Sequence, residues 1–180
     1  ASLFVTSGMQ GNACALMAWT RRGDCVVTDP HTHIAEHEAG SYAQLSGVSL
    51  RHPQSVNGTM DPDSVRACLT DDSDVQIAPV TLITMENAHS SGAVLPLENM
   101  RAVYAVAQEN HIPVHLDGAR LFNAAVVLGV SDVREMTQYC DSVMCCLSKG
   151  LCAPVGSILA GPKDLIHRAR RARRILGGGT

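Results

Sequence analysis

The sequence is short of charge, and of lysine in particular. Charged residues make up 17% of the 180 residues, against ~25% in ordinary globular domains, whereas hydrophobic residues make up 46%. This balance excludes a disordered or coiled-coil chain, and it suggests that part of the surface is covered by another subunit. Only two lysines, Lys149 and Lys163, accompany the arginines. Chemistry that needs a lysine amine therefore has two candidates.

Paired-cysteine motifs and long apolar runs are also missing. The seven cysteines include no CxxC pair and mostly lie within apolar runs, which favours a reduced protein of the cytoplasm or an organelle matrix. We expect a cytoplasmic location. No run of about 18 apolar residues and no signal-peptide pattern is present, so we expect no membrane partner. The net charge of −3 gives no reason to expect a nucleic-acid partner.

Apolar runs alternate with helical patterns along the chain. Helical spacing or helix-start signals predict helices after a glycine-containing turn at 6–12, after Asp61-Pro62, and at 96–110, 121–128 and 165–176, with a weak helix at 36–45. The predicted strands are 25–28, 48–52, 80–85, 112–116, 142–147 and 155–160. Strands that are apolar on both faces and alternate with helices predict an α/β fold, a mostly parallel sheet flanked by helices.

Polar residues follow three of these strands, at 86–89, 117–120 and 148–150. Ligands of open α/β sheets bind beyond the carboxyl ends of the strands. The turn at 7–12 opens a helix, whose free N–H groups and dipole favour an anion. Its spacing matches neither the dinucleotide-binding nor the Walker pattern. These ends of the sheet are therefore the predicted site.

Lys149 and Asp117 carry the chemistry that the site suggests. A lysine at the mouth of a buried strand is partly desolvated, which lowers the pKa of its amine and suits it to form a Schiff base. The structural alternative is a lysine whose stem packs at the strand end. Asp117 can face a protonated ring nitrogen, as a pyridoxal cofactor requires, or it can cap the next helix or pair with Arg120. With the helix start at 7–12, the two residues supply an amine, a ring-nitrogen partner and a phosphate site.

A histidine cluster offers a different function. His31, His33 and His37 are close in sequence and could bind Zn²⁺ in a metal-dependent hydrolase, although neither HExxH nor a cysteine pair is present. We favour a single histidine stacked on a cofactor ring over the metal site, and a plain surface cluster is the structural alternative. His89 can serve as an acid or base or be a loop residue. Arg120 can hold a carboxylate or an aldehyde oxygen.

Two segments carry a resemblance to a known family. The stretches HLDGARLFNA at 115–124 and LSKGLCAPVGS at 147–157 resemble those of low-specificity threonine aldolases, enzymes of the aspartate-aminotransferase-like, pyridoxal-phosphate-dependent fold. The segments SG at 7–8, GN at 11–12, LSGV at 45–48, PLEN at 96–99 and LGGG at 176–179 fit the same family. The resemblance spans nearly the whole chain.

The resemblance implies roles for individual residues. Lys149 matches the lysine that carries pyridoxal 5′-phosphate as a Schiff base, Asp117 matches the partner of the pyridine nitrogen, and Arg120 matches the arginine near the phenolic oxygen. His33 matches the histidine that stacks on the ring, and His89 the histidine near the substrate hydroxyl.

The family's phosphate site falls on Gly8 and Met9. The family usually has a hydroxyl residue where this sequence has Met9, so only the backbone N–H of Met9 is expected to contribute. Catalysis is thus expected to involve Lys149, His33 and His89, and no metal.

The resemblance also implies an activity and an assembly. The substrate is a β-hydroxy-α-amino acid, L-threonine or L-allo-threonine, cleaved to glycine and acetaldehyde by a lyase that works as a homodimer or homotetramer. We expect residues 1–180 to be the large cofactor domain, a fragment without the family's N-terminal segment and C-terminal small domain. A catalytically incomplete remnant that keeps the cofactor-binding fold is the main alternative, and a metal hydrolase built on the histidines is a second one.

Overall fold

The computed structural model describes residues 1–179. Its main feature is a sheet of seven strands, in the order β1-β9-β8-β7-β6-β2-β3 within the described residues. The strands are β1 (Ser2–Val5), β2 (Cys25–Val27), β3 (Ser49–Arg51), β6 (Val80–Glu86), β7 (Val114–Asp117), β8 (Ser142–Cys146) and β9 (Ser157–Ala160). The five strands β3, β2, β6, β7 and β8 run parallel to one another. Strand β9 is antiparallel to β8 and to β1. The predicted α/β fold with a mostly parallel sheet is confirmed.

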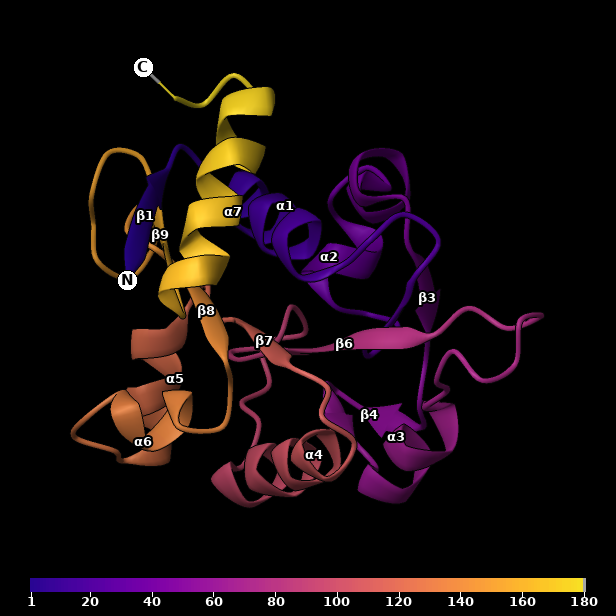
Figure 1. Ribbon diagram of the computed structural model, residues 1–180. Helices are drawn as coiled ribbons and strands as arrows, with labels where there is room; N and C mark the ends of the chain where they lie inside the picture. Colours follow the sequence, from indigo (N-terminus) through magenta and orange to yellow (C-terminus); the bar gives the residue numbers. More distant parts are fainter. Residues whose placement is uncertain (180) are drawn as a thin grey trace.

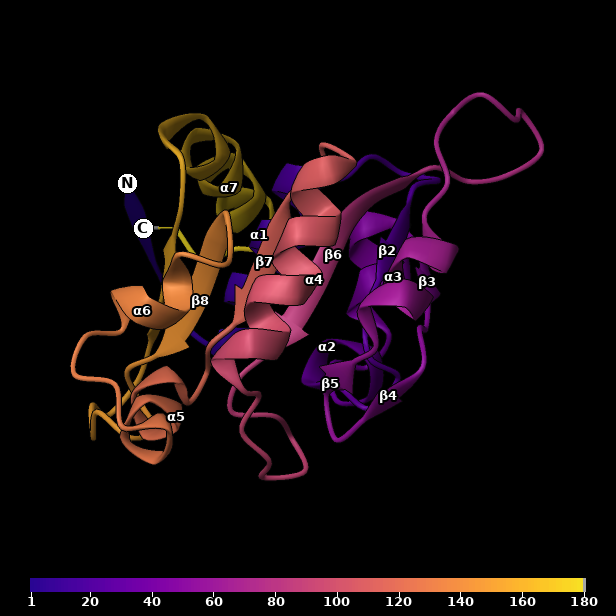
Figure 2. The ribbon, with the colours of Figure 1, turned by 90° about the horizontal axis from the view of Figure 1, so that it is seen from below.

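Helices cover both faces of the sheet (Figures 1 and 2). Their bounds are α1 (Gly8–Trp19), α2 (His33–Glu36), α3 (Pro62–Cys68), α4 (Leu97–Glu109), α5 (Leu121–Leu128), α6 (Arg134–Thr137) and α7 (Lys163–Ile175). Helices α1 and α7 pack side by side against β1, β8 and β9, where they share a core of small and aliphatic side chains. Helices α3, α4, α5 and α6 bury their apolar residues against the opposite face. A short hairpin, β4 (Ser55–Val56) and β5 (Thr59–Met60), lies beside α3.

Local signals place several of these elements where the sequence predicts them. Asp61 caps α3, since its carboxylate accepts the N–H of Ser64 at 2.9 Å. Helix α5 ends at Gly129, whose φ of 68° lies in the left-handed region. Helix α1 begins after Ser7, whose Oγ accepts the N–H of Gln10 at 3.1 Å. Ser7 therefore fixes the start of α1 at the edge of the sheet where the polar residues lie.

Three parts of the fold differ from expectation. The first residues form the edge strand β1, which the sequence pattern does not reveal because the strand is short. The polar stretch at 36–45 is not one helix, because α2 ends at Glu36 and a π-helical turn, η1 (Tyr42–Ser46), begins only later. Between them, Ala39 and Gly40 have φ angles of 51° and 69°, in the left-handed region. Helix α6 was also not expected. Within residues 1–179, no helix has both the length and the apolar character needed to cross a bilayer.

Candidate active site

A cavity of about 260 Å³ opens at the carboxyl ends of the central strands. Helix α1 contributes its first turn, α2 contributes His33, and β6, β7 and β8 contribute the residues at their ends. The lining consists of Thr6, Ser7, Gly8, Met9, Asn12, His33, Glu86, Asp117, Ala119, Arg120, Met144, Cys146, Ser148 and Lys149. Six of the seven predicted site residues are therefore brought together, and His89 is not among them.

Lys149 lies in the turn that follows β8 and is half-buried. The turn is closed by two backbone hydrogen bonds, from the Cys152 N–H to the Lys149 carbonyl at 3.0 Å and from the Ala153 N–H to the Leu147 carbonyl at 2.9 Å. Gly150 packs against α5 so closely that a Cβ there would lie 2.4 Å from Oδ1 of Asn123. These contacts place Lys149 at the cavity wall.

Asp117 is the last residue of β7 and is only 1% exposed. Its Oδ2 accepts a hydrogen bond from Nδ2 of Asn12 at 2.7 Å, and its Oδ1 accepts the N–H of Ala119 at 3.0 Å. Burial raises the pKa of Asp117 to about 6, and the charge of Glu86 adds to this, whereas the two hydrogen bonds oppose it. Asp117 is thus a desolvated acid that a positive partner would stabilise in its ionised form.

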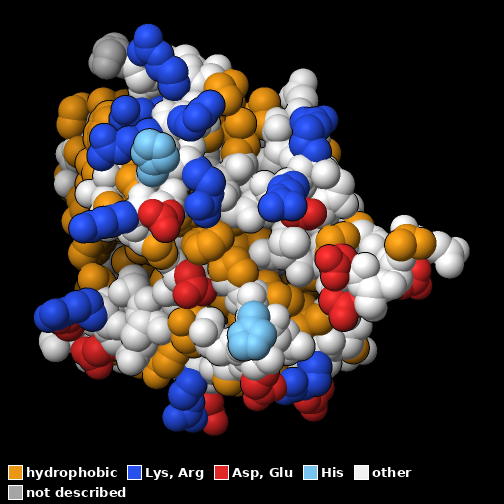
Figure 3. Space-filling model, in the orientation of Figure 1, with side chains coloured by type: hydrophobic (Ala, Val, Ile, Leu, Met, Phe, Trp, Pro, Cys, Tyr) orange, Lys and Arg blue, Asp and Glu red, His pale blue; other side chains and the backbone are white. Residues whose placement is uncertain are grey.

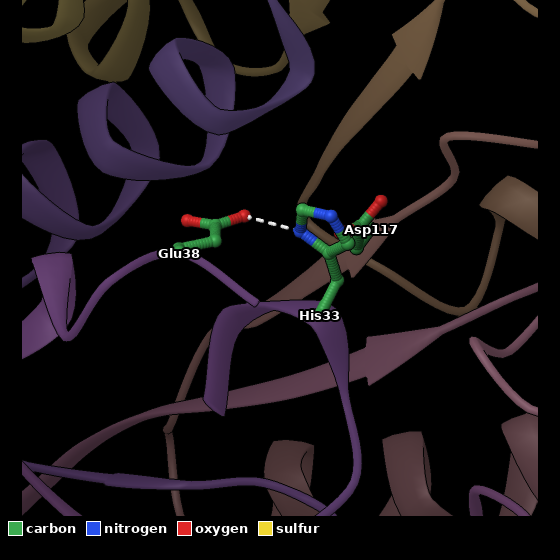
Figure 4. Close-up of side chains that lie close together, drawn as sticks. All are labelled: His33, Glu38 and Asp117. Atoms are coloured by element: carbon green, nitrogen blue, oxygen red, sulfur yellow. Dashed lines mark hydrogen bonds and ion pairs between the residues drawn. The ribbon is translucent and has the colours of Figure 1, made fainter. Parts of the chain in front are cut away.

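His33 begins α2, and its ring lies beside Asp117 (Figure 4). Its Nδ1 donates to Oε1 of Glu38 at 2.9 Å, and its backbone N–H donates to Oε2 of Glu86 at 2.8 Å. The hydrogen bond to Glu38 is the main reason why the pKa of His33 is raised, with the charge of Asp117 contributing. Because Nδ1 is occupied by Glu38, Nε2 is the ring atom of His33 that remains for chemistry.

The start of α1 supplies donors for an anion. The Ser7 side chain accepts the N–H of Gln10, and the Ser7 carbonyl accepts the N–H of Gly11. The N–H groups of Gly8 and Met9 precede the first intrahelical donor, so the helix offers them no acceptor. Their position in the cavity wall, with the helix dipole behind them, favours a phosphate.

These features fit pyridoxal phosphate. Among residues 1–179, Asp117 has no ion-pair partner. A protonated ring nitrogen would supply the missing charge at this buried carboxyl. Lys149 and the first turn of α1 line the same cavity. One small molecule could therefore present an aldehyde to Lys149 and a phosphate to the start of α1.

His89 lies outside the cavity lining, buried in the loop after β6. Its Nε2 lies 3.2 Å from Oδ1 of Asp29, and its Nδ1 lies 2.8 Å from Oγ of Ser91. Gly58 packs against the ring, since a Cβ there would lie 2.7 Å from Cδ2 of His89. The predicted place of His89 near the substrate hydroxyl stays a prediction.

His31, His33 and His37 do not form one group of candidate metal ligands among the described residues. His31 is exposed and contacts Glu36 at 2.9 Å, while the rings of His33 and His37 are 5.6 Å apart and tilted. Within the described residues, the one group of three candidate ligands with all donor atoms within 4.8 Å is His33, Glu38 and Asp117. The arrangement therefore favours the cofactor interpretation over the metal hydrolase.

Sequence reasoning gave no role to four buried polar residues of the site. These are Asn12, Glu38, Glu86 and His115. Two of them carried a usable signal: His115 is two residues before Asp117 in a strand, so both side chains point to the same face, and Asn12 is one helical turn after Gly8. Nothing in the sequence around Glu38 distinguishes it from a solvated carboxylate.

Comparisons with known proteins agree with this geometry. The family model described as beta-eliminating lyase matches residues 1–180. The chain is 40% identical over 183 residues to the low specificity L-threonine aldolase of Escherichia coli O157:H7, and 40% identical over 187 residues to low-specificity L-threonine aldolase 1 of Arabidopsis thaliana. These alignments cover 99% of this chain and 53% and 51% of those relatives. The chain thus spans about half the length of the curated relatives it matches.

Solved structures show the same fold. Threonine aldolase of Leishmania major superposes with a TM-score of 0.86 at 20% identity, covering 98% of this chain and 52% of that one. Aspartate aminotransferase of Thermus thermophilus with maleate superposes with a TM-score of 0.74 at 14% identity, covering 98% and 45%. The match to the lyase family and to the named aldolases confirms the lyase class and the pyridoxal-phosphate cofactor predicted from the sequence. The chain belongs to the beta-eliminating lyase family.

Proposed function

We propose that residues 1–180 form the pyridoxal-phosphate-binding large domain of an enzyme that cleaves L-threonine or L-allo-threonine to glycine and acetaldehyde. The observation that carries the proposal is the cavity in which Lys149, the buried acid Asp117 and the start of α1 meet. The relatives named low-specificity L-threonine aldolases support the substrate class. Such an enzyme serves threonine catabolism and glycine formation.

The residues of the cavity divide the work of binding. When bound, pyridoxal phosphate supplies an electron sink for the breaking of a bond at the α-carbon of an amino acid. Lys149 holds the cofactor covalently through its amine, and the N–H groups of Gly8 and Met9 bind the phosphate. Asp117 keeps a proton on the ring nitrogen, because an ionised carboxylate in a buried site stabilises the positive charge there. Arg120 orients an anionic oxygen at the cavity edge.

Cleavage requires a base that removes the proton from the β-hydroxyl of the substrate. His33 lines the cavity, and Nε2 is the atom that takes the proton, since Nδ1 donates to Glu38. His89 is the other candidate, acting itself or through a water, and it lies outside the cavity lining. The position of His33 makes it the stronger candidate. The proposal includes a homodimer or homotetramer and a cytoplasmic location.

A second candidate is a catalytically incomplete chain that binds the cofactor without turnover. The chain spans about half of the length of the named aldolases, so turnover has to be measured on this chain itself.

One experiment separates the two candidates. The purified chain is mixed with pyridoxal phosphate, its absorbance spectrum is recorded, and acetaldehyde is then measured after addition of L-threonine or L-allo-threonine. A bound-cofactor absorbance band with turnover supports the aldolase proposal, and a band without turnover supports the incomplete chain. Absence of the band contradicts both.

A further inference from the structure

Asn12 lies between two buried carboxylates of the site. It is 1% exposed on the face of α1 that meets the sheet. Its Nδ2 lies 2.7 Å from Oδ2 of Asp117 and 2.8 Å from Oε1 of Glu38. Both carboxylates are acceptors when ionised, so Asn12 must present its NH₂ group to them. Its two N–H bonds are therefore both used.

The orientation of Asn12 determines the tautomer of His115. With NH₂ facing the carboxylates, Oδ1 of Asn12 faces Nε2 of His115 at 3.2 Å. Oδ1 is an acceptor only, so Nε2 must carry the proton. Burial lowers the pKa of His115 to about 4, so the ring is neutral near pH 7 and Nδ1 is an acceptor.

The chain of hydrogen bonds continues to the far end of α1. Nδ1 of His115 lies 2.9 Å from Oγ of Ser142, which must donate its O–H there. Oγ of Ser142 in turn accepts the indole N–H of Trp19 at 2.8 Å. An indole nitrogen only donates, so the direction required at the Trp19 end agrees with the direction required at the carboxylates. The donor and the acceptor of every hydrogen bond in this series are thereby determined.

We propose that Asn12 is a positioning residue of the cofactor site, held in a single amide orientation by the buried chain Trp19–Ser142–His115 so that it donates to Asp117 and Glu38 together. One amide thus joins the acid that faces the ring nitrogen to the acid that holds His33 through Nδ1. The side chains that surround these groups are Glu86 from β6 and His33 from α2, and neither donates a side-chain hydrogen bond to Asp117 in the described residues.

Asn12 would thus fix the orientation of the Asp117 carboxylate and favour its ionised form. Without Asn12, Oδ2 of Asp117 would face the charges of Glu38 and Glu86 with no side-chain donor, which favours protonation of the carboxyl. A protonated Asp117 cannot stabilise a positive ring nitrogen. This consequence rests on the proposed function, whereas the hydrogen-bond chain itself does not.

The series of hydrogen bonds from Trp19 to Asn12 can be tested without cofactor. ¹⁵N NMR of histidine-labelled protein at pH 7 distinguishes the two neutral tautomers of His115. We expect a protonated Nε2 and an unprotonated Nδ1, and a shifted indole N–H resonance of Trp19 in Ser142→Ala. A protonated Nδ1, or a charged ring, would overturn the inference.

The cofactor arm uses Asn12→Asp, which keeps the size of the side chain but replaces the donor with an acceptor. We expect its dissociation constant for pyridoxal phosphate to rise at least about tenfold and its bound-cofactor band to shift. Asn99→Asp is the matched control, because Asn99 lies on α4 away from the cavity and donates to the carbonyl of Met60 in β5. Unchanged cofactor affinity and spectrum in folded Asn12→Asp would overturn the inference.

The NMR test and the cofactor-binding test distinguish failure of this inference from failure of the proposed function. If the unmodified chain does not bind pyridoxal phosphate, the proposed function fails. The tautomer of His115 in that same chain still supports or overturns the role of Asn12.

Discussion

Asp117 and Glu86 stand side by side at the ends of β7 and β6, where the strand register pairs them, and both are buried. Two adjacent carboxyl groups at the bottom of one cavity repel each other when both are ionised. The sheet holds them there because backbone hydrogen bonds between β6 and β7 fix the two strands. The site is thereby suited to a ligand that brings positive charge.

Asp117 should make the stability of the cofactor-free chain depend on pH. Burial raises its pKa from 3.8 to about 6, so the folded chain keeps a proton that the unfolded chain has already released. Stability from a raised pKa is present at low pH and is lost as the pH rises through the folded value. Relative to Asp117→Asn, the unmodified chain should lose about 2 kcal/mol of unfolding free energy between pH 4 and pH 8.

Urea unfolding at both pH values measures this difference. Asp63→Asn, at an exposed position on α3, serves as the control for the amide substitution itself. A difference between the unmodified chain and Asp117→Asn that does not change with pH would show that Asp117 is not a desolvated acid.

Glu38 should set the protonation of His33. The hydrogen bond between them raises the pKa of His33, so Glu38→Gln should lower it. NMR titration of the histidine ring protons measures the shift. His31 is an internal control, because Glu36 raises its pKa through a separate contact that Glu38→Gln leaves in place. If His33 acts as the base, the acidic limb of the activity profile moves to lower pH in the same variant.

The pair Asp29 and His89 should contribute more to stability than an exposed ion pair. Both side chains are almost fully buried, and Oδ2 of Asp29 also accepts the hydroxyl of Ser55 at 2.5 Å. Asp29→Ala leaves these groups unpaired, which should cost about 3 kcal/mol of unfolding free energy.

Glu109→Ala is the matched comparison, since Glu109 pairs with Arg66 at the surface and such pairs contribute below about 1 kcal/mol. Denaturant unfolding of both variants gives the comparison. Equal losses in the two would contradict a structural role for the buried pair.

The sequence predicts the central parts of the fold because periodicity and caps are local. Strand β6 is a continuous apolar run, α4 has helical spacing, and Gly129 ends α5. The edge strand β1 escapes prediction, because its four residues are recognisable only by their pairing with β9.

In the site too, local sequence patterns predict some residues and not others. Lys149 and Asp117 are predictable because one follows a buried strand and the other ends one, and because their segments resemble a family. The partners of the site residues are not predictable in this way. Asn12 is 105 residues from Asp117. Glu38 is only five residues from His33, but the two side chains meet because the chain turns after α2. Such contacts depend on how the elements pack, so local patterns do not contain them.

The central claim is that Lys149 carries the cofactor, and reduction with borohydride tests it most directly. The chain is loaded with pyridoxal phosphate, reduced and digested, and the modified peptide is identified by mass spectrometry. We predict a label on Lys149, lost in Lys149→Ala and retained in Lys163→Ala. A label on Lys163 instead, or no label at all, would contradict the account.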